Sequence, residues 1–369
     1  MFPVKERNLF LLMKRLHLIT RNTNVRIVLA GVFVVLVVGF LIPYASATTY
    51  TKGGDSVVDS VKKILPEVLK VLDKEKYDAL LIKNANYAST TATTTVRIWP
   101  AKAPYPNVGA IVPERRIISY YGNYYSTKMG ILGEFEPSVV LQKLRAEVAK
   151  WEAADPTTKV IPAIEYIAVV AQDDAGKSGL FRARMPDEHI DKAIAMAKEV
   201  DGIVILDVQV GLSTLQSEIP ALEKYLKMPQ VHLALDPEFS MKGGEEPGDV
   251  IGSFNANDIN YTINYLAKLV KDNNLPPKVL IVHRFTQRMV QNAESITPLP
   301  EVQVIMVMDG WGTPARKIGT YKSFIYPEPV QFTGFKIFYK NDLKPPSERL
   351  LTPSELLKLT PQPVFIQYQ

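Results

Sequence analysis

Short apolar runs rich in β-branched residues alternate with helical patterns over the last two thirds of the chain. Each run is almost continuously hydrophobic, which is typical of strands buried on both faces of a parallel sheet. Helical periodicity fills the intervening segments at residues 137–152, 186–200, 213–226, 258–272 and 313–324. The eight predicted strands cover residues 116–123, 160–170, 202–210, 231–239, 278–285, 302–310, 333–341 and 363–369.

Strand number and spacing together predict the fold class, α/β. Eight strands within about 255 residues match the count and length of a (β/α)8 barrel, a TIM barrel. An open doubly wound sheet is the alternative, but after the first strand the chain has only Gly122-Asn123-Tyr124 and no glycine-rich phosphate turn. We therefore predict a barrel over residues 113–369. No eighth helix follows the last strand, so we expect the helix around 56–72 or the linker to cover that gap.

The first 47 residues have the pattern of an export segment. Six basic residues and one acid occupy positions 1–26, and residues 27–42 are apolar or glycine without a charge. Small residues at Ala45 and Ala47 suit signal peptidase, whereas the uncharged stretch on to Thr51 could lengthen the segment into a retained anchor. We expect a signal peptide or transmembrane anchor over 27–47, a cytoplasmic tail, and a body outside the cytoplasm that is membrane-anchored or secreted.

Residues 48–112 are predicted to form a helical spacer and linker. An apolar seam over 56–72 could dock on the body, or it could pair weakly with another copy, although two heptads are few for a coiled coil and Pro66 would bend the helix. Residues 84–113 are rich in Thr, Ala and Pro, which favours a linker that keeps the body away from the membrane. The seam consists of Val57, Val61, Ile64, Val68 and Val71.

Composition and charge exclude several classes of function. The chain has 43 Lys and Arg against 38 Asp and Glu, and without the first 26 residues the balance is 37 against 37. A neutral body argues against nucleic acid as the ligand. The absence of cysteine excludes disulfides, thiol catalysis and zinc–thiolate sites. A metal-dependent hydrolase would need His283 with Asp207, Asp236 and Asp309 on one ion, but no HxH or HxxxH pair supports it, so we expect no cofactor.

Polar residues gather where the predicted strands end. In a (β/α)8 barrel the active site is built at these C-terminal ends, and a carboxylate elsewhere inside the barrel would have an unfavourable desolvation energy. Structural alternatives exist for several of them, since Glu165 could be a buried structural acid, Asp207 a helix cap and His283 a core histidine. Asp309 could form only a turn. The strand-end residues are Tyr121, Glu165, Asp207, Gln209, Asp236, Glu238, His283, Asp309, Tyr339 and Gln367.

These side chains suit a glycan. Aromatic rings pack on the apolar faces of sugars, and glycoside cleavage needs two carboxyl groups in different environments. We predict Glu238 as general acid, Asp207 or Asp309 as base or nucleophile, and Asp236 as a supporting acid. A non-catalytic barrel that binds a glycan or a partner through the same mouth is the alternative. The predicted substrate-binding residues are Tyr121, Glu165, Gln209, His283, Trp311, Tyr339 and Gln367.

The step Asp236-Pro237-Glu238 resembles the end of the signature of chitinase-like barrels, in which the Glu is the acid and the preceding Asp supports a substrate-assisted reaction. Only Asp236 and Glu238 match, and the upstream acids and glycines of that signature are absent. Over about 115–369, from YYGN through LDPEF and HRF to PVFIQYQ, the chain is similar to exported bacterial barrel proteins without an assigned activity, described as glycoside-hydrolase-like or as lipoproteins. That resemblance implies an envelope role and an envelope polymer as partner; the missing cysteine departs from the lipoprotein form.

Overall fold

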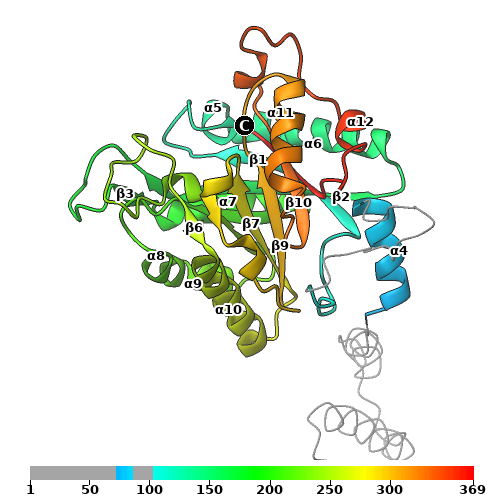
Figure 1. Cartoon of the computed structure of the whole chain (residues 1–369), viewed down its shortest axis with the longest axis horizontal. Coiled ribbons are helices and arrows are strands. Elements are labelled where there is room, and N and C mark those ends of the chain that lie inside the picture. The colour runs from blue at the N-terminus through cyan, green and yellow to red at the C-terminus, as the bar shows by residue number, and fades with distance from the viewer. Residues whose placement is uncertain (1–71, 86–102) are drawn as a thin grey trace, which may run out of the picture. The chain divides into compact units, whose positions relative to one another are not determined.

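The computed structural model describes residues 72–85 and 103–369 (Figure 1). All of these residues belong to one compact unit, Lys70–Gln369. The predicted tail 1–26, the export segment 27–47, the spacer helix with its proposed self-association, and most of the linker lie outside the described residues. Within the described ranges, no helix combines the length and the apolar character needed to cross a bilayer.

Eight parallel strands close into a barrel, which confirms the predicted (β/α)8 fold. β1 (Arg115–Gly122) pairs with β2 (Lys159–Ala171) on one side and with β11 (Phe365–Tyr368) on the other, so the first and last strands are joined. The ring continues through β4 (Ile203–Val208), β5 (Val231–Leu235), β7 (Lys278–Arg284), β9 (Val302–Met308) and β10 (Phe332–Ile337).

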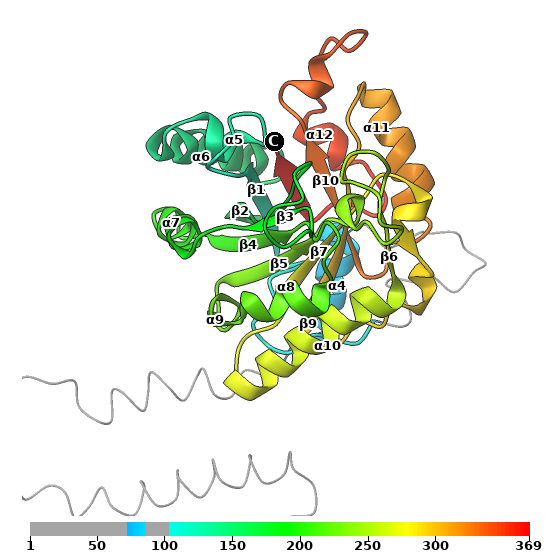
Figure 2. The same cartoon turned by 90° about the vertical axis from the view of Figure 1, so that its left-hand side faces the viewer.

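Helices surround the barrel, as the view along its axis shows (Figure 2). All five segments with helical periodicity contain helices, and two short helices at 131–134 and 353–356 lie outside them. The connection from β7 to β9 contains only 3₁₀ turns and the short strand β8 (Val290–Gln291), which pairs with β6 (Phe254–Asn255). The helices are α5 (Ile131–Glu134), α6 (Pro137–Ala154), α7 (Asp187–Lys198), α8 (Leu215–Ala221), α9 (Glu223–Leu226), α10 (Ala256–Asn273), α11 (Pro314–Thr320) and α12 (Pro353–Leu356); β3 (Arg182–Arg184) runs antiparallel to β2.

Local sequence explains where α10 begins and ends. The Asn255 side chain accepts hydrogen bonds from the backbone N–H of Asn257 and Asp258, and the Asp258 carboxylate accepts one from the Asn255 N–H, which together form a capping box. At the other end Asn274 adopts the left-handed conformation that terminates helices. The apolar face between these signals, which includes Ile263 and Leu266, is buried against the barrel.

α4 (Lys74–Ala85) packs on the N-terminal end of the barrel. Its Tyr77 and Leu81 are buried in the apolar cluster formed by the beginnings of the strands, among them Ile117, Ile203 and Val279. The compact unit therefore begins upstream of the boundary expected near Val112. α12 contacts α6, so these two helices meet across the seam between β11 and β1.

Candidate active site

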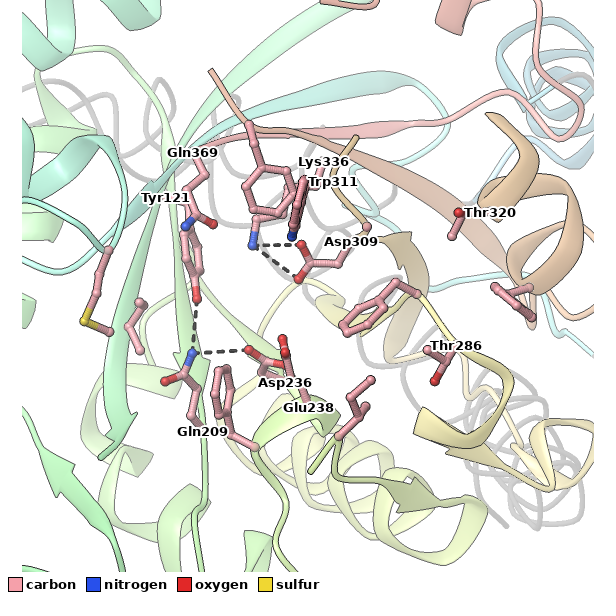
Figure 3. Close-up of a pocket in the computed structure, with 18 of the residues that line it drawn as sticks. Tyr121, Gln209, Asp236, Glu238, Thr286, Asp309, Trp311, Thr320, Lys336 and Gln369 are labelled. Carbon is pink, nitrogen blue, oxygen red and sulfur yellow. Dashed lines mark hydrogen bonds and ion pairs between the residues drawn. The ribbon is translucent and has the colours of Figure 1, made fainter. Parts of the chain in front are cut away.

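A cavity of ≈ 590 Å³ opens at the C-terminal ends of the strands (Figure 3). Its lining combines polar side chains from the strand ends with apolar walls that include Phe285 and Phe338. Six predicted site residues meet here although they come from different strands and loops, so the strand-end acids Asp236, Glu238 and Asp309 share one space. The six are Tyr121, Gln209, Asp236, Glu238, Asp309 and Trp311.

A second layer of polar side chains lies beneath the cavity and is fully buried. Each member stands two positions before a cavity-lining residue of its own strand, so it faces the same way one layer deeper. Four of them were predicted as site residues, and the structure places these below the cavity rather than on its wall. The layer consists of Ser119, Glu165, Asp207, His283 and Gln367, all 0% exposed.

Hydrogen bonds connect the two layers on one side of the cavity. The Tyr121 hydroxyl donates to Asp207 Oδ2 at 2.9 Å. Gln209 Nε2 donates to Asp236 Oδ2 at 3.2 Å and lies 3.4 Å from the Tyr121 hydroxyl (Figure 3). Because the Gln209 side-chain oxygen accepts from the Ala171 N–H at 3.1 Å, the amide is oriented with its nitrogen toward the carboxylate.

Ion pairs connect the layers on the other side. Lys336 Nζ lies 3.0 Å from Asp309 Oδ1, and His283 Nδ1 lies 3.2 Å from Asp309 Oδ2. The other ring nitrogen of His283 lies 3.5 Å from Glu165 Oε1, and the second oxygen of Glu165 accepts from the Ser119 hydroxyl at 3.1 Å. His283 therefore bridges two carboxylates, one in each layer.

The surroundings separate the carboxyl groups into two classes. Burial raises the pKa of Asp207 to about 8 and that of Asp236 to about 7. Burial and the neighbouring Asp309 charge raise the pKa of Glu238 to about 7. Burial would also raise the pKa of Asp309, but Lys336 and His283 hold it below its ordinary value.

The two cations beside Asp309 stay protonated. Burial would lower the pKa of His283, but the Asp309 charge and hydrogen bonds with Asp309 and Glu165 raise it well above its ordinary value. The pKa of Lys336 is also raised, because Asp309 outweighs the effect of burial. At neutral pH the cavity therefore holds an ionised Asp309 and a Glu238 that is partly protonated.

Asp236 positions Glu238. The predicted fourth strand ends at Leu235 rather than at residue 239, because Asp236 caps a 3₁₀ turn over Pro237–Phe239. Its Oδ1 accepts from the Glu238 N–H at 3.1 Å, and Pro237 fixes the first backbone angle of the turn. The turn presents the half-buried Glu238 side chain to the cavity.

Tyr339 is not brought to the cavity. Its ring stacks on Tyr368 with centroids 5.3 Å apart, and its hydroxyl lies 3.1 Å from that of Tyr120, within the cluster between strands and helices. Lys336 of β10 and Phe338 directly after the strand line the cavity, and Tyr339, the next residue, packs on the opposite face.

Sequence reasoning missed Lys336 and Ser119. A lysine within the apolar run TGFKIF was a usable signal, because a charge in a buried strand needs a partner. The Ser119 hydroxyl gave no comparable signal. Among the described residues, no group of three or more His, Asp and Glu side chains is arranged to hold a metal ion.

No family model matches the sequence, and no curated protein is significantly similar to it. Among solved structures, the chain is similar to a ruminal GH26 endo-β-1,4-mannanase, with 12% identity and a TM-score of 0.35 over 69% of this chain and 59% of that one. It is also similar to a GH5 xyloglucan-specific endo-β-1,4-glucanase from a metagenomic library in complex with cellotriose, with 11% identity and a TM-score of 0.36 over 80% and 90% of the two chains. A Bacteroides ovatus GH5 xyloglucanase in complex with a XXXG heptasaccharide shows 12% identity and a TM-score of 0.28 over 60% and 61%.

The chain thus spans less than two thirds of the mannanase and of the xyloglucanase. Identities and scores of this size carry no argument about activity, which depends on the residues of the site.

Proposed function

We propose that this barrel hydrolyses an envelope or extracellular glycan, with Glu238 as general acid and Asp309 as its ionised partner. The observation that carries the proposal is that two carboxyl groups line one cavity in different surroundings. Asp309 is paired with Lys336 and His283, whereas Glu238 has no ion pair within the described residues. The pKa of Glu238 is raised to about 7, whereas that of Asp309 is held below its ordinary value. Two carboxyl groups whose environments separate their pKa values in this way are what glycoside cleavage requires.

Each role follows from position and charge. Protonated Glu238 gives its proton to the oxygen of the breaking glycosidic bond. Ionised Asp309 either takes a proton from the water that attacks the sugar carbon, or attacks that carbon itself to form a glycosyl–enzyme that water then hydrolyses. Asp309 is favoured over Asp207 for the second role, because Asp207 lies below the cavity and accepts the Tyr121 hydroxyl hydrogen bond. Gln209 and Tyr121 offer polar atoms to sugar hydroxyls, and Trp311 offers an aromatic face.

Covalent catalysis through Lys336 is disfavoured. A lysine that attacks a carbonyl must lose its proton, which requires a lowered pKa. The Asp309 carboxylate raises the pKa of Lys336, and its ammonium group lies 4.2 Å from the centre of the Tyr121 ring, a second stabilising contact for the charged form. Lys336 therefore serves to keep Asp309 ionised.

Activity should have a bell-shaped dependence on pH. Glu238 works when protonated, so kcat/KM should decline as the pH rises through about 7. Asp309 works when ionised, so activity should decline only as the pH falls through a value below the ordinary 3.8. The measurement is the rate of reducing-end release from cell-wall and capsular glycans between about pH 3 and about pH 9. An optimum on the alkaline side would contradict the assignment of Glu238, and binding without any release would identify a binding module.

In the same proposal the barrel lies outside the cytoplasm, secreted or anchored through residues 27–42. Six basic residues before Ile27 favour an N-terminus that stays inside, and Ala45 and Ala47 suit signal peptidase. Protease added to intact cells should digest Lys70–Gln369, and should spare residues 1–26 where the segment is retained. A body that is protected until the cells are lysed would refute this location.

A further inference from the structure

An exposed tryptophan with two cations marks the rim of the cavity. Trp311 is 48% exposed and lies on the same side of the cavity as Asp309 and Lys336 (Figure 3). The Arg316 guanidinium carbon is 5.9 Å from the centre of its ring, and the Lys344 ammonium is 5.2 Å from it. A sugar carboxylate that reaches the indole therefore lies near these two cations.

Neither cation is neutralised. Arg316 and Lys344 form no ion pair with any Asp or Glu of residues 72–85 and 103–369, whereas the nearby exposed Lys340 pairs with Glu134 at 2.7 Å. Lys128, another residue of the cavity lining, likewise has no acidic partner in this part of the chain. Positive charge at the rim is thus available to a ligand.

Buried contacts hold this rim in place. The Asp342 carboxylate accepts from the Gly312 N–H at 3.0 Å and from the Phe338 N–H at 2.9 Å, and it pairs with Lys317 at 2.6 Å. The loop that carries Trp311 is therefore tied to the loop that leads to Lys344. Gly312 has φ of +141°, and a Cβ there would lie 2.9 Å from Arg316 Cδ, so glycine leaves room for the arginine to pack against the loop.

The whole lining favours an anion at the rim. Three cations, Lys128, Arg316 and Lys336, face three carboxyl groups, Asp236, Glu238 and Asp309. Lys336 compensates Asp309, and the raised pKa values of Asp236 and Glu238 leave both partly protonated near neutral pH. The charges that line the cavity then sum to a positive value.

We propose that the glycan taken by this cavity is acidic, and that a uronic acid residue is held at Trp311 with its carboxylate on Arg316 and Lys344. The inference rests on the proposed function for the presence of a glycan in the cavity and adds the class of sugar. Arginine and lysine both bind carboxylates through charge-assisted hydrogen bonds, and the planar guanidinium can use two at once. The neighbouring sugar would then extend toward Glu238 and Asp309.

Matched oligosaccharides test this. Binding of the full-length protein is measured by calorimetry with β-1,4-linked mannuronate and mannose hexamers, and with β-1,4-linked glucuronate and glucose hexamers. The two hexamers of each pair differ only in whether their sugars carry a carboxylate. We expect at least one uronate hexamer to bind about tenfold more tightly than its neutral counterpart at low salt, the effect of one hydrogen bond to a charged group. Arg316→Gln and Lys344→Gln should each remove most of that preference. Lys322→Gln changes an exposed lysine that makes no cation–π contact with Trp311 and should leave the preference unchanged.

The outcomes separate this inference from the proposed function. Equal binding of charged and neutral hexamers, binding of neither, or a preference that survives both substitutions overturns the uronic acid assignment. Cleavage of a neutral hexamer that depends on Glu238 would then leave the proposed hydrolase intact. Conversely, a uronate preference that depends on Arg316 and Lys344, without product release by the wild-type protein, supports the inference while it refutes hydrolysis.

Discussion

Glu238→Gln should keep the fold and lose about 10²- to 10⁴-fold in the turnover of a glycan with a poor leaving group, the contribution of a positioned proton donor. The amide has the shape of the carboxyl group and still forms hydrogen bonds, but it has no proton to give. Because the pKa of Glu238 is about 7, the wild-type residue is partly protonated near neutral pH, and glutamine resembles this protonated form in shape and charge. Thermal melting, glycan binding and product release are measured side by side.

The leaving group and a second glutamate provide controls. Aryl glycosides with acidic leaving groups need little protonation, so their turnover should fall much less in Glu238→Gln. Glu246→Gln changes an exposed glutamate of the following loop and should alter neither turnover nor melting. A variant that melts far below the wild type would make Glu238 structural, and loss of binding without a change in kcat would assign it to substrate contact.

The sequence predicts the barrel well because each strand is specified locally. Runs such as VHLAL and KVLIVHR are continuous in β-branched and aliphatic residues, and only a sheet covered on both faces buries them fully. The convergence of Asp236 and Asp309 follows from the same fact, since the C-terminal ends of parallel strands meet at one end of a barrel. α4 had no comparable signal, because its burial depends on the apolar strand beginnings against which Leu81 packs.

Depth within the barrel could not be predicted in the same way. Gln209 and Asp207 differ by one layer, and which of them reaches the cavity depends on the stagger between strands rather than on either strand alone. For the same reason the sequence predicts Tyr339 at the cavity where the structure has Lys336. No turn residue marks the end of β10, so the sequence alone does not show which of its alternating side chains face the cavity. His283 pairs with Asp309, directly after the neighbouring strand β9, which the order of strands along the chain makes predictable. The second partner of His283, Glu165, belongs to β2, which is not a neighbour of β7 in the barrel.

Lys336→Met should destabilise the protein by about 3 to 5 kcal/mol, the usual consequence of removing one member of a buried ion pair. Met fills much of the space of the lysine side chain, so the loss comes mainly from the charge left on Asp309, whose side chain is 6% exposed. His283 alone then compensates that carboxylate, and the pKa of Asp309 should rise. Chemical denaturation measures the free energy of unfolding, and the acid limb of the pH–rate profile should move to higher pH.

A double substitution distinguishes a charge effect from a packing effect. Lys336→Met combined with Asp309→Asn removes both members of the pair, so the double variant should recover much of the stability lost in Lys336→Met, because a buried pair replaced as a whole is often close to neutral. It should nevertheless remain inactive, since no ionised carboxylate then faces Glu238. Lys340→Met, which removes an exposed lysine paired with Glu134, should change stability by less than about 1 kcal/mol. If Lys336→Met has no greater effect than this control, Asp309 does not depend on Lys336 for its charge, and the role assigned to Lys336 is wrong.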